Sequence, residues 1–227
     1  ASAGQTVTTS TYYTDLASGT FTVVPAPATQ TITILPGQLH TPGVTTYGAA
    51  VTGVPFTQTA GAGLVAEVKA VDDYFNTVTS YTGSVSLTTN DSNDTHPSTP
   101  NVFTAGVASF TATPTTKGTT HNMIPSTGLT DTVSDNFSVD PGTASQVILF
   151  LPNDSALNEG AQSLAAARTT GAYNINAATN FNINAYIVDS YFNIVDDDTT
   201  QVTLGFFGDN YATDNGPSTV TDGYAQF

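Results

Sequence analysis

The nine residues from Ala70 to Val78, AVDDYFNTV, return between Ile187 and Val195 as IVDSYFNIV. The two stretches lie 117 residues apart and share the pattern Val-Asp-x-Tyr-Phe-Asn. Similarity at a fixed, long offset indicates that a chain is built from successive copies of one structural unit.

Further matches support this repeat and fix its limits. At the same offset, Gly43 corresponds to Gly160, Val85 to Val202, Leu87 to Leu204, and residues 106–110 to residues 223–227. At an offset of 116, Phe21 and Val23 correspond to Phe137 and Val139. We therefore divide the chain into the terminal strands of one repeat (1–25), a complete repeat (26–141) and a repeat without its last strands (142–227).

Short alternating segments fill the complete repeat. Residues 64–70 place Leu64, Ala66, Val68 and Ala70 on one face, as in a half-buried strand. Further strands are expected at residues 31–35, 84–87, 108–113, 121–124 and 137–139. About seven short strands in a repeat of this size predict an all-β chain with little helix, made of tandem immunoglobulin-like β-sandwiches with Greek-key connections.

Three of these segments carry a family resemblance. The patterns A-V-D-x-Y-x-N-x-V at 70–78, G-x-A-x-F at 106–110 and F-T-V at 21–23 resemble bacterial immunoglobulin-like domains, which form tandem arrays in S-layer proteins and invasin-like adhesins. The resemblance implies an extracellular, cell-surface location and a spacer, lattice-forming or adhesive role. The chain has no Cys and no Trp, so antibody-like recognition is not implied.

The charge balance excludes several classes of partner. Eighteen acidic residues face only Lys69, Lys117 and Arg168, for a formal charge of −15. Nucleic acid and anionic membrane surfaces both need clustered basic residues, so neither is expected as a partner. No apolar run reaches the roughly 20 residues of a membrane span. The small, polar start at Ala1 is what we expect after signal-peptide removal.

The acidic turns have two interpretations. Asp and Asn oxygens bind Ca²⁺, but the same side chains also cap turns by accepting backbone N–H groups. For Asp72 and Asn76 we favour capping, because they recur in step with the repeat as Asp189 and Asn193. All four remain candidate metal ligands. For the adjacent Asp196, Asp197 and Asp198 both interpretations stay open, since an ion would relieve the repulsion of three carboxylates. No cofactor is required by the sequence, and Ca²⁺ is the one candidate.

No catalytic constellation is apparent, and we expect no enzyme activity. His40, His96 and His121 are isolated and lack zinc-ligand spacing, and no G-x-S-x-G elbow occurs. The only glutamates are Glu67 and Glu159, and Glu67 lies in mid-strand on the polar face.

Four N-x-[ST] sequences are candidate glycosylation sites. They begin at Asn90, Asn93, Asn136 and Asn153. Several are expected by chance in a chain so rich in Asn, Ser and Thr. The first two fall in a loop that we expect to be exposed.

These features predict a structural subunit of a cell-surface layer or filament, with copies of itself as partners. The alternative is an adhesin or glycan-binding segment of a larger surface protein. In that case exposed tyrosines would provide contacts, as Tyr side chains commonly do at interfaces. The candidates are Tyr12, Tyr13, Tyr173 and Tyr211.

The repeat boundaries suggest how copies could join. Phe227 stands in the position of Phe110, from which 27 positions lead to Phe137 in the complete repeat. Residues 1–25 copy the missing piece, and joining Phe227 of one chain to the next chain would leave 21 positions to Phe21. We therefore expect donor-strand exchange, with Val7, Phe21 and Val23 entering the open sandwich of another copy near Phe227. The alternative, equally open, is that the sequence is a slice of a longer array.

Overall fold

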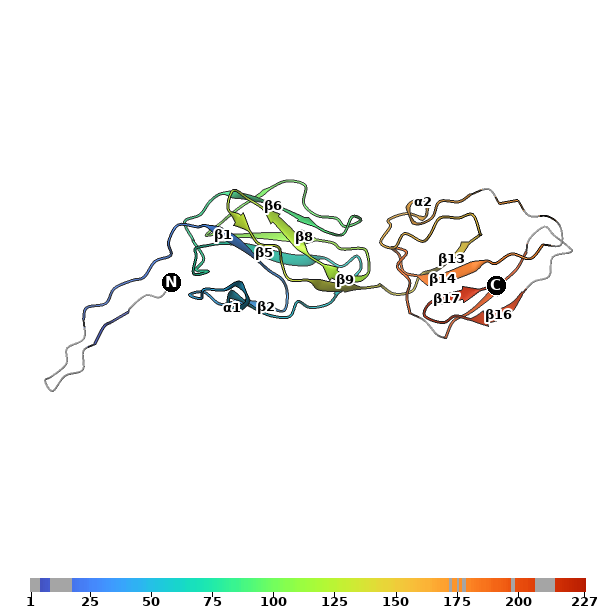
Figure 1. Ribbon diagram of the computed structural model, residues 1–227, viewed down its shortest axis with the longest axis horizontal. Helices are drawn as coiled ribbons and strands as arrows, with labels where there is room; N and C mark the ends of the chain where they lie inside the picture. Colours follow the sequence, from blue (N-terminus) through green and yellow to red (C-terminus); the bar gives the residue numbers. More distant parts are fainter. Residues whose placement is uncertain are drawn as a thin grey trace.

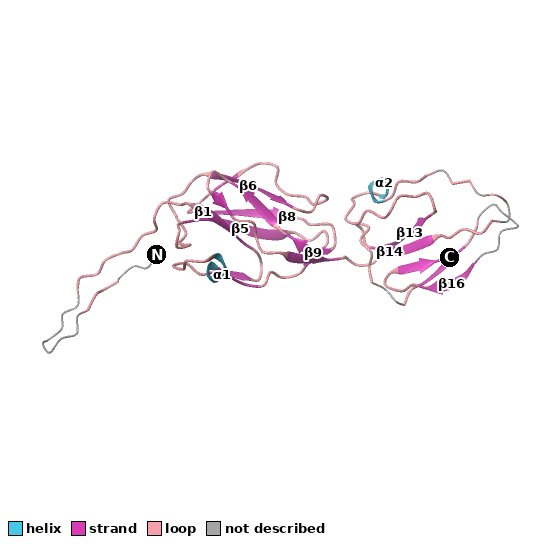
Figure 2. Ribbon diagram, in the orientation of Figure 1, coloured by secondary structure: helices cyan, strands magenta, loops and turns pink. Residues whose placement is uncertain are grey.

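The computed structural model describes residues 5–8, 18–171, 173, 174, 176, 179–196, 199–206 and 215–227. The prediction of an all-β chain with little helix is confirmed: its only helices in the described ranges, α1 (Tyr47–Ala50) and α2 (Leu164–Ala167), have four residues each. Strands gather into two units that lie end to end, as Figures 1 and 2 show. We call them the first unit and the second unit and use for them the limits expected from the sequence, 26–141 and 142–227. The immunoglobulin-type, Greek-key topology and the domain limits remain predictions.

The first unit contains four small sheets. Their orders are β11-β1-β5-β8, β10-β6-β7, β4-β12-β9 and β2-β3. The strands are β1 (Gln30–Ile34), β2 (Gln38–His40), β3 (Val51–Gly53), β4 (Gln58–Thr59), β5 (Leu64–Val71), β6 (Ser84–Thr89), β7 (Asn101–Val102), β8 (Val107–Ala112), β9 (Gly118–His121), β10 (Met123–Ser126), β11 (Thr130–Asp131) and β12 (Phe137–Asp140). The longest ladder joins β5 to β8, antiparallel, from Leu64 opposite Ala112 to Lys69 opposite Val107.

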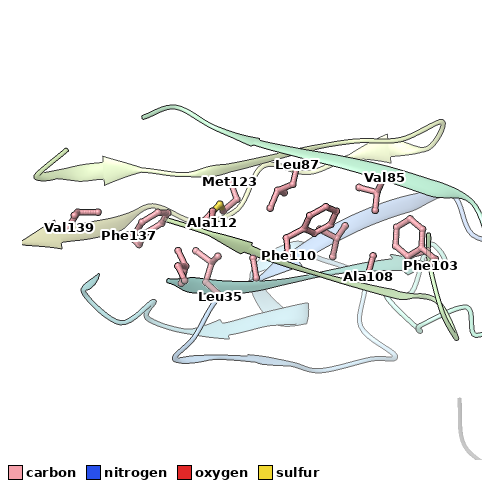
Figure 3. Close-up of a cluster of buried hydrophobic side chains, with 14 of the residues drawn as sticks. Leu35, Val85, Leu87, Phe103, Ala108, Phe110, Ala112, Met123, Phe137 and Val139 are labelled. Atoms are coloured by element: carbon pink, nitrogen blue, oxygen red, sulfur yellow. The ribbon is translucent and has the colours of Figure 1, made fainter. Parts of the chain in front are cut away.

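The core of the first unit lies between these sheets. Apolar residues at every second position of β5 and β8 face those of β6, β10 and β12, with Phe103 closing one end (Figure 3). Phe110, from β8, is 2% exposed. Burying such a side chain stabilises the fold by roughly 1.5–3 kcal/mol. The alternation in the sequence therefore determines which face of each strand enters the core.

The second unit repeats part of this arrangement. Its strands are β13 (Gln146–Phe150), β14 (Asn184–Val188), β15 (Gln201–Leu204), β16 (Asn215–Thr219) and β17 (Tyr224–Gln226), in the orders β13-β14-β17 and β15-β16. The registers agree with the first unit, because Val202 lies opposite Ser218 as Val85 lies opposite Asn101. β13, β14, β15, β16 and β17 are thus the counterparts of β1, β5, β6, β7 and β8.

Candidate assembly site

The chain begins with a hairpin that stands outside both units. Its described part, residues 5–8 and 18–24 (the N-terminal hairpin), leads away from the first unit in Figure 1. Gln5 and Phe21 form an antiparallel bridge. The backbone N–H of Val7 donates to Ser18 Oγ at 3.0 Å, and the N–H of Ser18 donates to the Val7 carbonyl oxygen at 3.0 Å.

Hydrogen bonds of the same kind occur in the first unit, 116 residues further on, between β9–β10 and the segment that leads into β12. There His121 pairs with Phe137. The N–H of Met123 donates to Ser134 Oγ at 2.9 Å, and the N–H of Ser134 donates to the Met123 carbonyl oxygen at 3.0 Å. In both places the serine hydroxyl also donates to the carbonyl of the next residue, at 2.8 Å. The described part of the N-terminal hairpin therefore has the hydrogen bonds that join residues 121–123 to residues 134–137 in the first unit.

The two hairpins differ in burial. In the first unit, Met123 is 0% exposed and Phe137 is 3% exposed, because both side chains enter the core. Their counterparts Val7 and Phe21 are 60% and 48% exposed. The sequence prediction named these residues as assembly contacts, and the structure leaves their apolar side chains in solvent. Apolar side chains exposed together mark a candidate interaction surface.

A groove in the second unit lies between β13 and β15. It is lined by Val147 and Leu149 of β13 and by residues 200–204, and its volume is about 370 Å³. We call it the acceptor groove. Both β13 side chains are exposed apolar residues. Phe227 lies on the neighbouring core of the second unit, where it packs against Ile187, Val220 and Ala225.

In the first unit the corresponding space is filled. β11 pairs in parallel with β1, Thr31 opposite Asp131, and β10 pairs with β6, Pro125 opposite Leu87. Thr31, which corresponds to Val147, is 0% exposed and donates its hydroxyl proton to Asp131 Oδ1 at 2.8 Å. Within the described residues the second unit has no counterpart of β9, β10, β11 or β12. The acceptor groove thus corresponds in position to the space that residues 123–131 fill in the first unit.

The repeated Asp-x-Tyr-Phe-Asn segment forms a capped turn in each unit. Asp72 Oδ1 accepts the N–H groups of Tyr74 and Asn76, both at 2.9 Å, and Asp189 Oδ1 likewise accepts those of Tyr191 and Asn193. Burial by itself raises the pKa of Asp72, but hydrogen bonds from Asn76, Ala26 and Tyr74 outweigh it and lower the pKa below its ordinary value. These contacts are those of the capping interpretation.

The turn of the second unit also fixes the junction between the units. Asn193 is fully buried, donates from Nδ2 to the Thr115 carbonyl at 2.8 Å and accepts the N–H of Lys117 at 2.9 Å. Lys117 Nζ donates to the Ile194 carbonyl at 2.9 Å and lies 3.4 Å from Glu159 Oε1. Polar contacts of both backbone and side chain therefore set the orientation of the second unit on the first.

The candidate metal ligands do not converge in the described residues. Asp72 and Asp189 belong to separate turns with their oxygens already hydrogen-bonded, and Asp196 is exposed. Asp197 and Asp198 lie outside the described residues. No group of three or more His, Cys, Asp or Glu side chains that could hold an ion occurs in the described part of the chain. Calcium binding at Asp196–Asp198 stays a prediction.

The histidines lie apart, each with its own surroundings. His40 Nε2 bonds the Phe75 carbonyl at 2.8 Å, His96 Nδ1 bonds Asp94, and His121 stacks near Phe137. Glu67 pairs with Lys69 on the polar face of β5. No helix long and apolar enough to cross a membrane occurs among the described residues.

The glycosylation candidates differ in their surroundings. Asn90, Asn136 and Asn153 are exposed, and Asn93 is half-buried. Asn90 Nδ2 donates to the Thr120 carbonyl at 2.8 Å, and Asn93 Nδ2 donates to the Glu159 carbonyl at 3.1 Å. The amide of Asn93 therefore contributes to the junction. Modification at any of the four stays a prediction.

A second hollow lies at the far end of the second unit. Its volume is about 470 Å³, and its lining includes Tyr173, Phe181, Tyr186 and Gln226. The Tyr173 and Phe181 rings lie 5.7 Å apart. Of the four tyrosines expected as glycan contacts, Tyr173 thus lines a hollow, whereas Tyr12, Tyr13 and Tyr211 lie outside the described residues.

Sequence reasoning found Val7, Phe21 and Val23 but missed Ser18, Val147 and Leu149. Ser18 could have been found, because it aligns with Ser134 at the same offset as Phe21 with Phe137. The groove residues also had a signal. Val147 and Leu149 stand where the first repeat has Thr31 and Thr33, so the repeats differ in polarity there.

No family model and no curated protein matches the chain. A solved structure of domains 5–6 of the S-layer protein SbsC is similar at 14% identity and a TM-score of 0.29, with 78% of this chain and 81% of that chain covered.

Proposed function

We propose that this chain is an extracellular structural subunit that polymerises head to tail at the cell surface, by insertion of the N-terminal hairpin of one copy into the acceptor groove of the preceding copy. The observation that carries the proposal is the hairpin itself. Its described residues have the hydrogen bonds that join residues 121–123 to residues 134–137, yet Val7 and Phe21 are exposed where Met123 and Phe137 are buried.

The groove supplies the complementary half. It lies where β10 and β11 lie in the first unit, and its β13 edge carries exposed Val147 and Leu149. Strand addition would pair that edge and bury apolar side chains on both partners. Burying Val7 and Phe21 would contribute roughly 1.5–3 kcal/mol each. A contact between two different surfaces of the same chain repeats without closing, so the product is a filament or an open lattice.

Truncation tests the proposal. We expect the chain of residues 1–227 to form polymers in sedimentation and electron microscopy, and the chain of residues 26–227 to remain monomeric. A synthetic peptide of residues 1–25 should bind the truncated chain with one-to-one stoichiometry. The same peptide with Val7→Ser and Phe21→Ser is the matched control and should not bind.

Two results would contradict donor-strand exchange. One is a truncated chain that polymerises like the parent. The other is a parent chain whose groove is occupied by its own hairpin or by a following segment of the same chain. The cell-surface location has its own test: antibodies against the second unit should label intact cells.

Glycan binding is the second candidate, and the aromatic hollow of the second unit supports it. Tyr173 and Phe181 offer ring faces, and Gln226 offers an amide beside them. A glycan array with the truncated chain separates the candidates. Saturable binding that Tyr173→Ala removes would favour an adhesin.

A further inference from the structure

The two Asp-x-Tyr-Phe-Asn turns have the same backbone structure but different neighbours. Phe75 and Phe192 both adopt positive φ angles, 57° and 59°. The Tyr191 ring packs against the core of the first unit and lies beside Gly61. Tyr74, at the same position of the first turn, is 57% exposed. Tyr74 of the first unit is thus exposed, whereas Tyr191, the corresponding residue of the second unit, packs against the unit that precedes it.

The chain enters both units through the same contact. Asp189 Oδ2 accepts the N–H of Gly142 at 2.7 Å, and Asp72 Oδ2 accepts the N–H of Ala26 at 3.0 Å. Gly142 follows β12, and Ala26 follows the N-terminal hairpin at the equivalent distance along the chain. The N-terminal hairpin is therefore connected to the Asp72 turn in the same way as β12 is connected to the Asp189 turn.

These two relations place the next molecule. When the hairpin completes the second unit of another copy, it brings that unit next to the Asp72 turn. The first unit lies next to the Asp189 turn in the same way. We propose that Tyr74 and the turn of residues 72–76 form a docking surface for the second unit of the preceding copy, with Tyr74 in the position that Tyr191 holds at the junction inside each chain. This inference rests on the proposed polymerisation.

Chemical labelling tests the docking surface directly. The chain has no cysteine, so a single introduced thiol reports on one position alone. Tyr74→Cys should react with a maleimide at least tenfold more slowly in polymers than in the monomeric chain of residues 26–227. Phe56→Cys is the matched control, because Phe56 is 64% exposed and precedes β4, which pairs with the end of β12 that leads to the second unit. Its rate should be unchanged.

Assembly gives an independent measurement. Tyr74→Ala should raise the critical concentration for polymerisation about tenfold, as loss of an aromatic interface anchor commonly does. The melting temperature of the monomer should not change, and Phe56→Ala should leave assembly unaltered. Polymers that form normally with the Tyr74 position still reactive would overturn this inference alone. A parent chain that does not polymerise would overturn it together with the proposed function.

Discussion

The ring of Tyr191 lies against the backbone of Gly61, so that a side chain at position 61 could not occupy the same space. Gly61 also has a φ angle of +80°, a conformation that residues with a Cβ atom rarely adopt. A glycine is therefore required twice at this point, by the backbone and by the ring of the following unit.

Replacing Gly61 with alanine should weaken the junction. The ring of Tyr191 would have to move, and we expect the free energy of unfolding to fall by about 1–3 kcal/mol in urea denaturation. Gly43→Ala is the control, because Gly43 has a φ angle of +81° but open space at its Cβ position. Equal losses in the two variants would mean that the ring contact does not contribute.

Replacing Asn193 with alanine should cost more stability than the same change at Asn76. Asn193 is fully buried, and its removal leaves the Thr115 carbonyl and the Lys117 N–H without their present partner. A buried group left unsatisfied costs about 1–3 kcal/mol. Amide exchange at Lys117 should accelerate in Asn193→Ala and stay unchanged in Asn76→Ala. Identical exchange in both variants would contradict the bridging role.

Two adjacent valines of the N-terminal hairpin should differ in their effect on assembly. Val23 corresponds to buried Val139, whereas Val24 corresponds to exposed Asp140, and both valines are exposed in the monomer. Val23→Ser should raise the critical concentration for polymerisation roughly tenfold, given the apolar area it would bury. Val24→Ser should leave it unchanged. A similar effect of both would show that the hairpin does not bind in the register of β12.

The junction should lose stability in acid, because Asp91 accepts the N–H groups of Thr115 and Thr116, and the Thr115 carbonyl accepts a hydrogen bond from Asn193 of the second unit. Asp91 is buried, which raises its pKa, but hydrogen bonds from Thr116, Asn93 and Thr115 outweigh this and lower the pKa below the ordinary 3.8. The unfolded chain then binds more protons than the folded chain as pH falls through that value. The stabilisation is complete above about pH 5 and is lost progressively below about pH 4.

Asp91→Asn measures this contribution. The amide cannot accept the same set of N–H donors as a carboxylate, so the variant should be less stable at pH 7. Its free energy of unfolding should also change less between pH 5 and pH 3 than that of the parent. An unaltered pH profile would assign the acid sensitivity to other carboxylates.

Calcium should raise the melting temperature if Asp196, Asp197 and Asp198 bind it. Binding to the folded state alone adds about 2.7 kcal/mol at a hundredfold excess over Kd. The measurement is thermal melting of the parent and of Asp196→Asn in Ca²⁺ and in a chelator. Identical curves in all four conditions would leave these residues as an ordinary solvated loop.

The sequence predicted the long strands because their alternation is strong. β5 was expected at residues 64–70 and extends from Leu64 to Val71, and β1 differs from its expected range by one residue at each end. The shortest strands, such as β4 and β7, have two residues each and leave no periodic pattern. They form because neighbouring strands supply partners, which is a tertiary effect that local sequence does not encode.

The sequence predicted only one part of the assembly site, the N-terminal segment. The copied pattern alone identified residues 1–25 as the donor segment, since Phe21 matches Phe137 by simple alignment. The contacts at the junction between the two units could not be predicted in the same way. The sequence offers Asn193 as a turn residue and candidate metal ligand, and its bonds to Thr115 and Lys117 depend on how the two units meet.

The hydrogen bond from the Gly142 N–H to Asp189 Oδ2 also affects how the chain carries mechanical load. Tension along the long axis in Figure 1 enters the second unit at Gly142 and continues into β13, which pairs antiparallel with β14 over five residues, from Gln146 opposite Val188 to Phe150 opposite Asn184. Pulled in this direction, the ladder is sheared, so its hydrogen bonds resist together and do not open one after another. A polymer of such units would behave as a stiff tether whose rupture force is set by whole ladders.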